Sequence, residues 1–207
     1  MSDTTDRWKS LVRHAVRRAT DEVTKIPGVA QAKGALRELR NLGAVVPTEL
    51  VRAELLRTPS LQSLSMSISD SGVHIEASFD DADDITVRVV PGQVRFAARG
   101  AKEVSFEVHP VEVARHRHAQ DLVVAIASAV ARALWAAVLR GDNNSTPMAI
   151  VDRDAENVFR IDLRTLSILK KARGGAAVSV MLDALALESI RATEGALRLK
   201  VTTPILF

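Results

Sequence analysis

LVVAIASAVARALWAAVL, residues 122–139, is the stretch of sequence that decides the fold. Its only polar side chains are Ser128 and Arg132, so a helix formed here is apolar around nearly its whole circumference. Such a helix needs apolar cover on more than one side. On both sides, the stretch is flanked by short segments in which apolar and polar residues alternate, as is typical of strands. We therefore expect one sheet, or two, to pack around this single helix.

The residues before this stretch alternate between apolar and polar, with the period of two that is typical of strands. The alternation predicts an antiparallel meander of five strands, apolar on one face and solvated on the other. Turns are expected at Asp70–Gly72, at the acidic loop Asp80–Asp84, at Pro91–Gly92 and at Gly100. The apolar positions of the five strands are Leu64, Met66 and Ile68; Val73, Ile75, Ala77 and Phe79; Ile85, Val87 and Val89; Val94, Phe96 and Ala98; and Val104, Phe106 and Val108.

The long helix itself is predicted from Pro110 to about Arg140, and strands resume after it. Together with the meander, this order predicts an α+β fold in which a predominantly antiparallel sheet wraps a long central helix. The elements expected after the helix are strands over 148–151 and 158–163, a short helix over 165–172, a long bent strand over 177–192, and a final strand over 197–201 that follows a turn at Glu194–Gly195.

Residues 1–58 are predicted to form a helical N-terminal region, followed by the sheet and long-helix domain over residues 59–207. Its helices are expected at about Asp6–Ile26, at about Ala30–Leu42, and from a cap at Thr48 to near Pro59.

The first of these helices has a basic face, because five basic residues and no acidic residue lie between Arg7 and Arg18. A tryptophan at the border of its apolar face completes a pattern that is typical of helices lying on an anionic membrane surface. The alternative is a helix that docks on its own domain and exposes a solvated basic face. In the membrane interpretation the contact residues are Trp8, Arg13, Arg17 and Arg18.

Composition excludes several classes of function. The 207 residues contain no Cys, which excludes disulfides, thiolate metal sites and Cys nucleophiles. Aromatic residues make up 3% and the net charge is only +3, so binding of nucleic acid is not favoured. The polar start of the chain lacks the apolar core of a secretory signal, which predicts a cytoplasmic protein, with the basic helix offering peripheral contact to the inner membrane.

The polar motifs do not form a catalytic or metal-binding pattern. His109, His116 and His118 lie close together with Glu112, but their spacing is too loose for a ligand set, and the aspartates of 80–84 lack the pattern of a calcium loop. Nucleotide-binding loops and the GxSxG elbow are absent from the sequence. A membrane span over 122–139 is disfavoured by Arg132 in its middle. We therefore expect a protein that is not an enzyme, with no catalytic residue, no metal and no cofactor.

Three segments carry a resemblance to a known family: ISDSGVHIEASF (68–79), FRIDLRTLSILKK (159–171) and LALESIRATEGALRLKV (185–201). Strands, a long apolar helix, and further strands ending in a hairpin with an acidic-Gly turn resemble the tubular lipid-binding (TULIP) superfamily, which includes the SMP domains and the bactericidal permeability-increasing protein family. The resemblance covers roughly residues 60–203. It implies a strongly curved antiparallel sheet around a long helix, with an apolar groove for lipid.

The resulting expectation is that the protein binds a lipid or other long apolar molecule and carries or presents it. The alternative is a scaffold protein that self-associates into a homo-oligomer through the same apolar faces. The alanines of 125–133 allow either close packing or an open cavity, and the sequence leaves both open. The residues expected to line the groove are Leu64, Met66, Ile68, Val73, Ile75, Phe96, Phe106, Leu122, Ile126, Val130 and Leu134.

Overall fold

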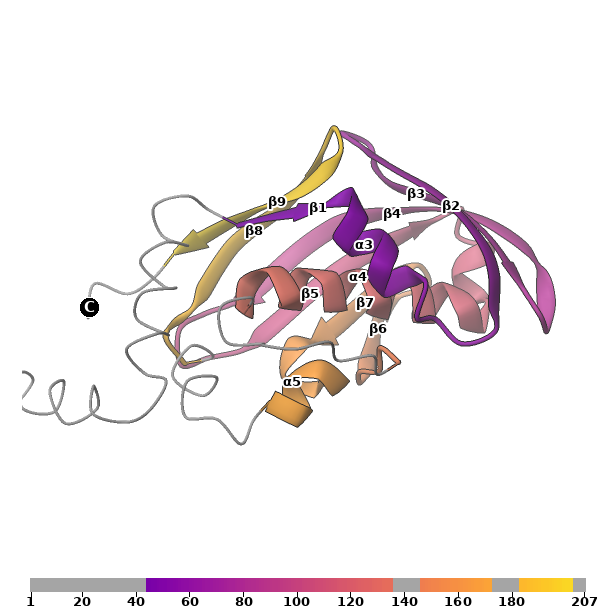
Figure 1. Ribbon diagram of the computed structural model, residues 1–207. Helices are drawn as coiled ribbons and strands as arrows, with labels where there is room; N and C mark the ends of the chain where they lie inside the picture. The colour runs from indigo at the N-terminus through magenta and orange to yellow at the C-terminus, as the bar shows by residue number, and fades with distance from the viewer. Residues whose placement is uncertain (1–43, 136–145, 173–182, 203–207) are drawn as a thin grey trace, which may run out of the picture.

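The computed structural model of the chain describes residues 44–135, 146–172 and 183–202. Within these ranges nine strands form one antiparallel sheet, accompanied by a small number of helices (Figure 1). The prediction of an α+β fold with an antiparallel sheet is confirmed. The helices predicted over Asp6–Ile26 and Ala30–Leu42, and with them Trp8, Arg13, Arg17 and Arg18, lie outside the described residues.

The predicted meander contains four strands, and the prediction of five is wrong. The strands are β2 (Leu61–Ser69), β3 (Gly72–Phe79), β4 (Ala82–Phe96) and β5 (Lys102–His109). Pro91 and Gly92 make no turn: β4 runs through them, and its register with β5 shifts between Pro91 and Val94. A proline cannot donate to the ladder, and a bulge accommodates it without ending the strand.

The C-terminal half adds two hairpins to this sheet. They are formed by β6 (Val151–Ala155) with β7 (Val158–Asp162), and by β8 (Ala186–Thr193) with β9 (Ala196–Thr202). The second hairpin turns at the predicted Glu194–Gly195. The strand order is β1-β9-β8-β4-β5-β7-β6, with β3 attached to β4 and β2 to β3. The part of the predicted strand over 177–182 lies outside the described residues.

Residues 44–58 pack into the same core as the sheet. β1 (Ala44–Pro47), which the sequence did not predict, pairs antiparallel with β9. The predicted third helix follows as α3 (Thr48–Leu55), and its Val51 and Leu55 side chains are fully buried. Thr48 is not a cap: it is the first residue of α3, and its hydroxyl donates to the Gly195 carbonyl oxygen at 2.8 Å.

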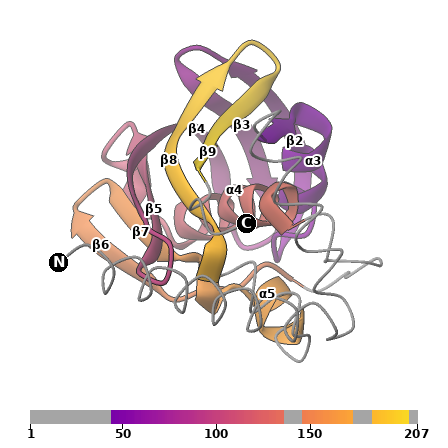
Figure 2. The same cartoon turned by 90° about the vertical axis from the view of Figure 1, so that its left-hand side faces the viewer.

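The long apolar helix is α4 (Arg117–Trp135), which has 19 residues. It begins later than the predicted Pro110, because a 3-10 turn, η1 (Val113–Arg115), and an extended residue, His116, come first. Every side chain from Leu122 to Ala131 is buried, as the apolar circumference predicted. α4 packs against β1, β5 and β7 of the sheet and against α3. Figure 2 shows α4 together with α3, β5 and β7. Two short elements, η2 (Leu163–Thr165) and α5 (Ser167–Ala172), follow β7.

Candidate functional site

The residues predicted to line a groove lie together in one hydrophobic cluster between α4 and the sheet. All of them are buried except Leu64, which is partly buried and packs against the cluster. The side chains of Leu122, Ile126, Val130 and Leu134 have no exposed surface. A side chain without exposed surface has no water-sized gap beside it. In this conformation the interface between α4 and the sheet is therefore filled by side chains.

The alanines of α4 are buried in the same way as these larger side chains. Ala125, Ala127, Ala129 and Ala131 have no exposed surface, and Ala133 is partly buried. Their small side chains let the neighbouring elements approach α4 closely, so this stretch of the helix leaves no open cavity beside it.

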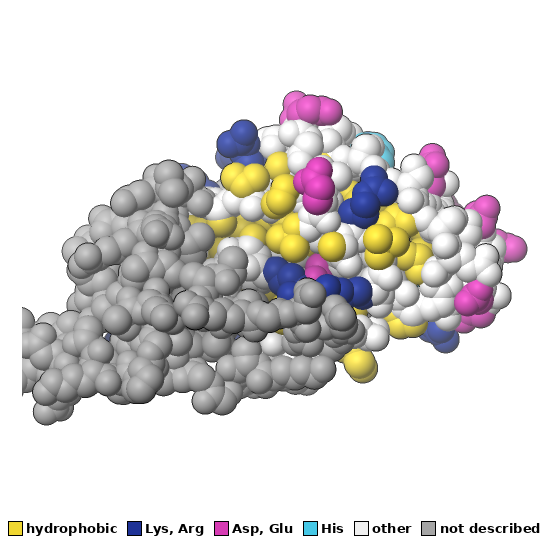
Figure 3. All heavy atoms as spheres, viewed as in Figure 1, with side chains coloured by type: hydrophobic (Ala, Val, Ile, Leu, Met, Phe, Trp, Pro, Cys, Tyr) yellow, Lys and Arg dark blue, Asp and Glu magenta, His cyan; other side chains and the backbone are white. Residues whose placement is uncertain are grey.

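One short helix, α3, lies between solvent and part of this apolar interior. α3 packs on α4 and beside β2, with Val51 and Leu55 pointing inward. Where α3 ends and β2 begins, Leu56 is 60% exposed, and Leu61 and Leu64 are partly exposed. Figure 3 shows hydrophobic side chains on this face, with charged side chains around them. We call the boundary formed by Leu56, Leu61 and Leu64 the α3–β2 seam.

A buried ion pair connects α3 to α4. Glu54 of α3 has a side chain that is 3% exposed, and its Oε1 accepts hydrogen bonds from Arg57 Nη1 at 2.6 Å and from Arg132 Nε. Arg132 is the charged residue that interrupts the apolar stretch of α4 in the sequence. The pair explains its presence, because a charge among apolar side chains is tolerated when a partner neutralises it.

Two further hydrogen bonds connect α3 to the sheet. Arg52 Nη2 donates to the Met66 carbonyl oxygen of β2 at 3.3 Å. At the other end, the Thr48 amide donates to the Gly195 carbonyl oxygen at 3.2 Å. α3 is thus held to the sheet by hydrogen bonds in its first and last turns, which contribute about 1 kcal/mol each.

The N-terminus of α4 carries a cluster of charged residues. His118 is buried and stacks on Phe79, with ring centroids 3.9 Å apart. Its Nε2 lies 2.9 Å from Asp81 Oδ1, and its Nδ1 lies 3.7 Å from Asp121 Oδ2. Burial raises the pKa of Asp121 above its usual value, and the opposing attraction of His118 and Arg117 is smaller. The cluster connects α4 to the acidic turn between β3 and β4.

The three histidines considered for a metal do not converge. His109 Nε2 lies 3.6 Å from Glu107 Oε2, whereas His118 pairs with the two aspartates and His116 is exposed. Among the residues that the structure describes, no group of three His, Asp or Glu side chains could hold a metal ion.

Lys102 is a buried lysine that sequence reasoning missed. It is 2% exposed, and its Nζ donates to the carbonyl oxygens of Ala97 at 2.5 Å and Leu185 at 2.7 Å. The ammonium also lies 4.6 Å from the centroid of the Phe96 ring. Burial lowers its pKa from 10.5 to about 8. One signal was available: Lys102 occupies an apolar-facing position in the alternation that continues with Val104.

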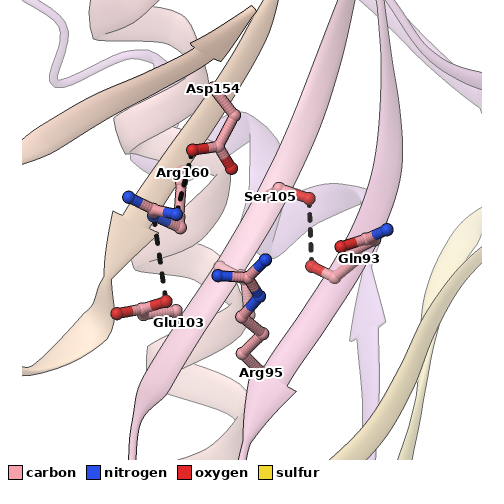
Figure 4. Close-up of a pocket in the computed structure, with 7 residues that line it drawn as sticks. Gln93, Arg95, Glu103, Ser105, Asp154 and Arg160 are labelled. Atoms are coloured by element: carbon pink, nitrogen blue, oxygen red, sulfur yellow. Dashed lines mark hydrogen bonds and ion pairs between the residues drawn. The ribbon is translucent and has the colours of Figure 1, made fainter.

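A small polar pocket lies on the opposite, solvated face of the sheet (Figure 4). Its volume is about 10 Å³, which is room for about one water molecule. The pocket is too small for an organic ligand. Its lining residues are Gln93, Arg95, Glu103, Val104, Ser105, Asp154 and Arg160.

Comparison with protein-family models, with characterised proteins and with solved structures finds no match to this chain. None of the helices within the described ranges is long and apolar enough to cross a membrane.

Proposed function

We propose that the protein binds a lipid or another long apolar molecule against α4 and carries or presents it without making or breaking a bond. One observation carries the proposal: α4 is apolar around its circumference, and an eight-residue helix, α3, covers part of it. In this proposal the sheet curves around α4 as in the TULIP domains that the sequence resembles. The ligand enters at the α3–β2 seam.

Because side chains fill the interior, the ligand must displace α3. Exposing Val51 and Leu55 costs roughly 1.5–3 kcal/mol each, and separating Glu54 from Arg132 costs about 3–5 kcal/mol. Each CH₂ group that the ligand buries contributes about 0.8 kcal/mol, so a chain with about ten buried CH₂ groups gains roughly 8 kcal/mol. The two sums are comparable, which favours a long acyl chain over a short or compact apolar molecule.

The basic helix predicted near Arg7–Arg18 would bring the protein to an anionic membrane surface, where each basic residue adds roughly 1 kcal/mol of attraction. Residues 7–18 lie outside the described ranges, so the membrane contact is proposed from the sequence alone.

The test combines native mass spectrometry of the purified protein with titration of a fluorescent fatty acid. Co-purified lipid, or saturable uptake of the probe, is the expected result. Leu64→Lys places a charge at the seam and should weaken uptake by about tenfold or more, since a buried charge opposes an apolar ligand. Ser63→Lys is the matched control, because neighbouring residues of a strand point to opposite faces and Ser63 is exposed.

Absence of co-purified lipid together with absence of uptake would overturn the proposal. Equal uptake by the Leu64→Lys and Ser63→Lys variants would overturn the entry route.

Self-association through the same apolar faces is the competing interpretation. Those faces are buried in the core among the described residues, and the large apolar side chains that remain exposed there are Val45, Leu56, Met148 and Ile150. Light scattering separates the two interpretations: a stable large assembly without bound lipid would favour the scaffold.

A further inference from the structure

The edge of the sheet at β6 carries an unusual pattern of exposed side chains. β6 is the last strand in the sheet order and, among the described residues, pairs with β7 alone. Residues 146–150 lead into it without regular secondary structure, although the sequence predicted a strand over 148–151. Met148 is 66% exposed and Ile150 is 61% exposed. The side chains of Asp152 and Asp154 are 64% and 39% exposed, and both contact Arg160 across the register shift between Arg153 and Ala155. At alternate positions along this edge, two exposed apolar side chains are therefore followed by two exposed acidic side chains.

Residues 146–150 are held by hydrogen bonds to the elements that follow β7. The Ser167 amide donates to the Met148 carbonyl oxygen at 2.8 Å, and the Ile150 amide donates to Thr165 Oγ1 at 2.9 Å. These bonds attach the main chain at Met148 and Ile150 to α5 and η2. The exposure of Met148 and Ile150 is thus a property of an ordered edge.

The acidic part of the edge has excess negative charge. Arg160 of β7 lies 2.9 Å from Asp154 and 3.8 Å from Glu103 (Figure 4). It also lies 3.4 Å from Asp152. Arg95 of β4 lines the same pocket. Three carboxylates therefore face two guanidinium groups. A further cation beside Asp152 and Asp154 would be attracted to them.

We propose that β6 accepts an extended segment of another protein as an additional antiparallel strand. Its basic side chains would lie opposite Asp152 and Asp154, and its apolar side chains opposite Met148 and Ile150. Main-chain hydrogen bonds to a sheet edge supply affinity in this mode of binding, and side chains that alternate on one face supply specificity.

The β6 edge of a second copy of this chain does not fit this edge. Antiparallel pairing about a twofold axis keeps each side chain on its own face of the sheet, so Asp152 can meet only residues 148, 150, 152 and 154 of the copy. Each such register places aspartate against aspartate, which is destabilising, or against Ile150 or Met148. Arg153 cannot help, because it lies on the other face, 4.8 Å from the centroid of the Phe159 ring. A basic segment of a different protein therefore fits this edge better than β6 of a second copy does.

The test uses the full chain and two labelled synthetic peptides with fluorescence anisotropy as the readout. The first peptide has two lysines followed by two valines at alternate positions, with threonine elsewhere, so that antiparallel pairing matches the edge. The second has glutamate in place of each lysine. We expect saturable binding of the lysine peptide, at least about tenfold weaker binding of the glutamate peptide, and slower hydrogen exchange of the Val151 and Arg153 amides in the complex.

Variants of the protein test the same contact from the other side. The double variant Asp152→Asn with Asp154→Asn should bind the lysine peptide about tenfold more weakly, because the attraction of two carboxylates is lost. Asp70→Asn with Asp84→Asn, an exposed aspartate in the turn before β3 and another near the start of β4, should leave binding unchanged. Equal affinity for the two peptides, absence of saturable binding, or protection of other strands in place of β6 would overturn the proposal.

Discussion

Glu54 of α3 and Arg132 of α4 form an ion pair that lies almost entirely inside the protein. Their side chains are 3% and 15% exposed, and Arg57 joins the pair through the same carboxylate oxygen. From Leu122 to Trp135, Arg132 is the only residue of α4 that carries a formal charge. The pair therefore determines which face of α4 lies under α3.

Replacing Glu54 by alanine should lower the free energy of unfolding by about 3–5 kcal/mol, because it leaves a largely buried guanidinium without this carboxylate. Urea denaturation measures the change. Glu188→Ala is the control: its pair with Lys200 has side chains that are 53% and 65% exposed, and such pairs contribute less than about 1 kcal/mol. Equal losses in the two variants would show that the Glu54 pair is no more important than a surface pair.

Gly72, the first residue of β3, should not tolerate a side chain. Its φ is +131°, and a Cβ would lie 2.7 Å from the Val89 carbonyl oxygen. Gly72→Ala should cost about 2–3 kcal/mol of stability. Gly195→Ala, at φ +72° with open space around it, should cost about 1 kcal/mol. Thermal unfolding compares them, and a larger loss at Gly195 would contradict this account.

Local patterns predicted the parts of the fold that depend on local sequence. The apolar circumference of α4 and the alternation on either side of Gly72 and Gly195 can be read within a few turns of chain. Each gave an element of the correct type in the correct place.

Elements that depend on distant partners were not predicted. β1 has four residues, and its partner β9 lies about 150 residues later in the chain, so no local signal marks it as a strand. Pro91–Gly92 has the local signature of a turn, but pairing of β4 with β3 before it and with β5 after it keeps the strand continuous.

The candidate site was predicted in composition but not in geometry. The apolar residues predicted to line a groove do lie together, because alternation determines which face of a strand is apolar. Whether alanine leaves space or permits close contact depends on how far apart two elements lie, and sequence spacing does not determine that distance. The pairing of Glu54 with Arg132 joins residues 78 positions apart and has no local signal.

Asp121 should make the protein less stable as the pH rises. Burial raises its pKa above 3.8, so between 3.8 and the raised value the folded state binds more protons than the unfolded state. Stability therefore falls as pH increases through that window, and at pH 7 the ionised carboxylate is a cost.

Asp121→Asn should remove this cost and be more stable than the wild type at pH 7, by an amount that shrinks as the pH is lowered toward 3.8. Urea midpoints at several pH values measure the difference. Asp70→Asn, in an exposed turn, is the control and should change stability little at any pH. A difference that grows on acidification would contradict the sign of the shift.

Lys102 should make the protein more stable as the pH rises through the alkaline range. Burial lowers its pKa from 10.5 to about 8; Asp183 opposes this shift and Arg164 adds to it. Between pH 8 and 10.5 the unfolded state keeps a proton that the folded state has released, so stability rises with pH across that window.

Lys102→Met keeps the length of the side chain and removes the titrating amine, although the carbonyl oxygens of Ala97 and Leu185 lose their donor at every pH. The free energy of unfolding of the wild type minus that of Lys102→Met should therefore increase from pH 8 to 10.5 and be level below pH 7, since the other titrating groups are common to both proteins. Lys200→Met, which removes an exposed ammonium, should give a level difference throughout. A level difference for Lys102→Met as well would mean that the buried ammonium keeps its ordinary affinity for the proton.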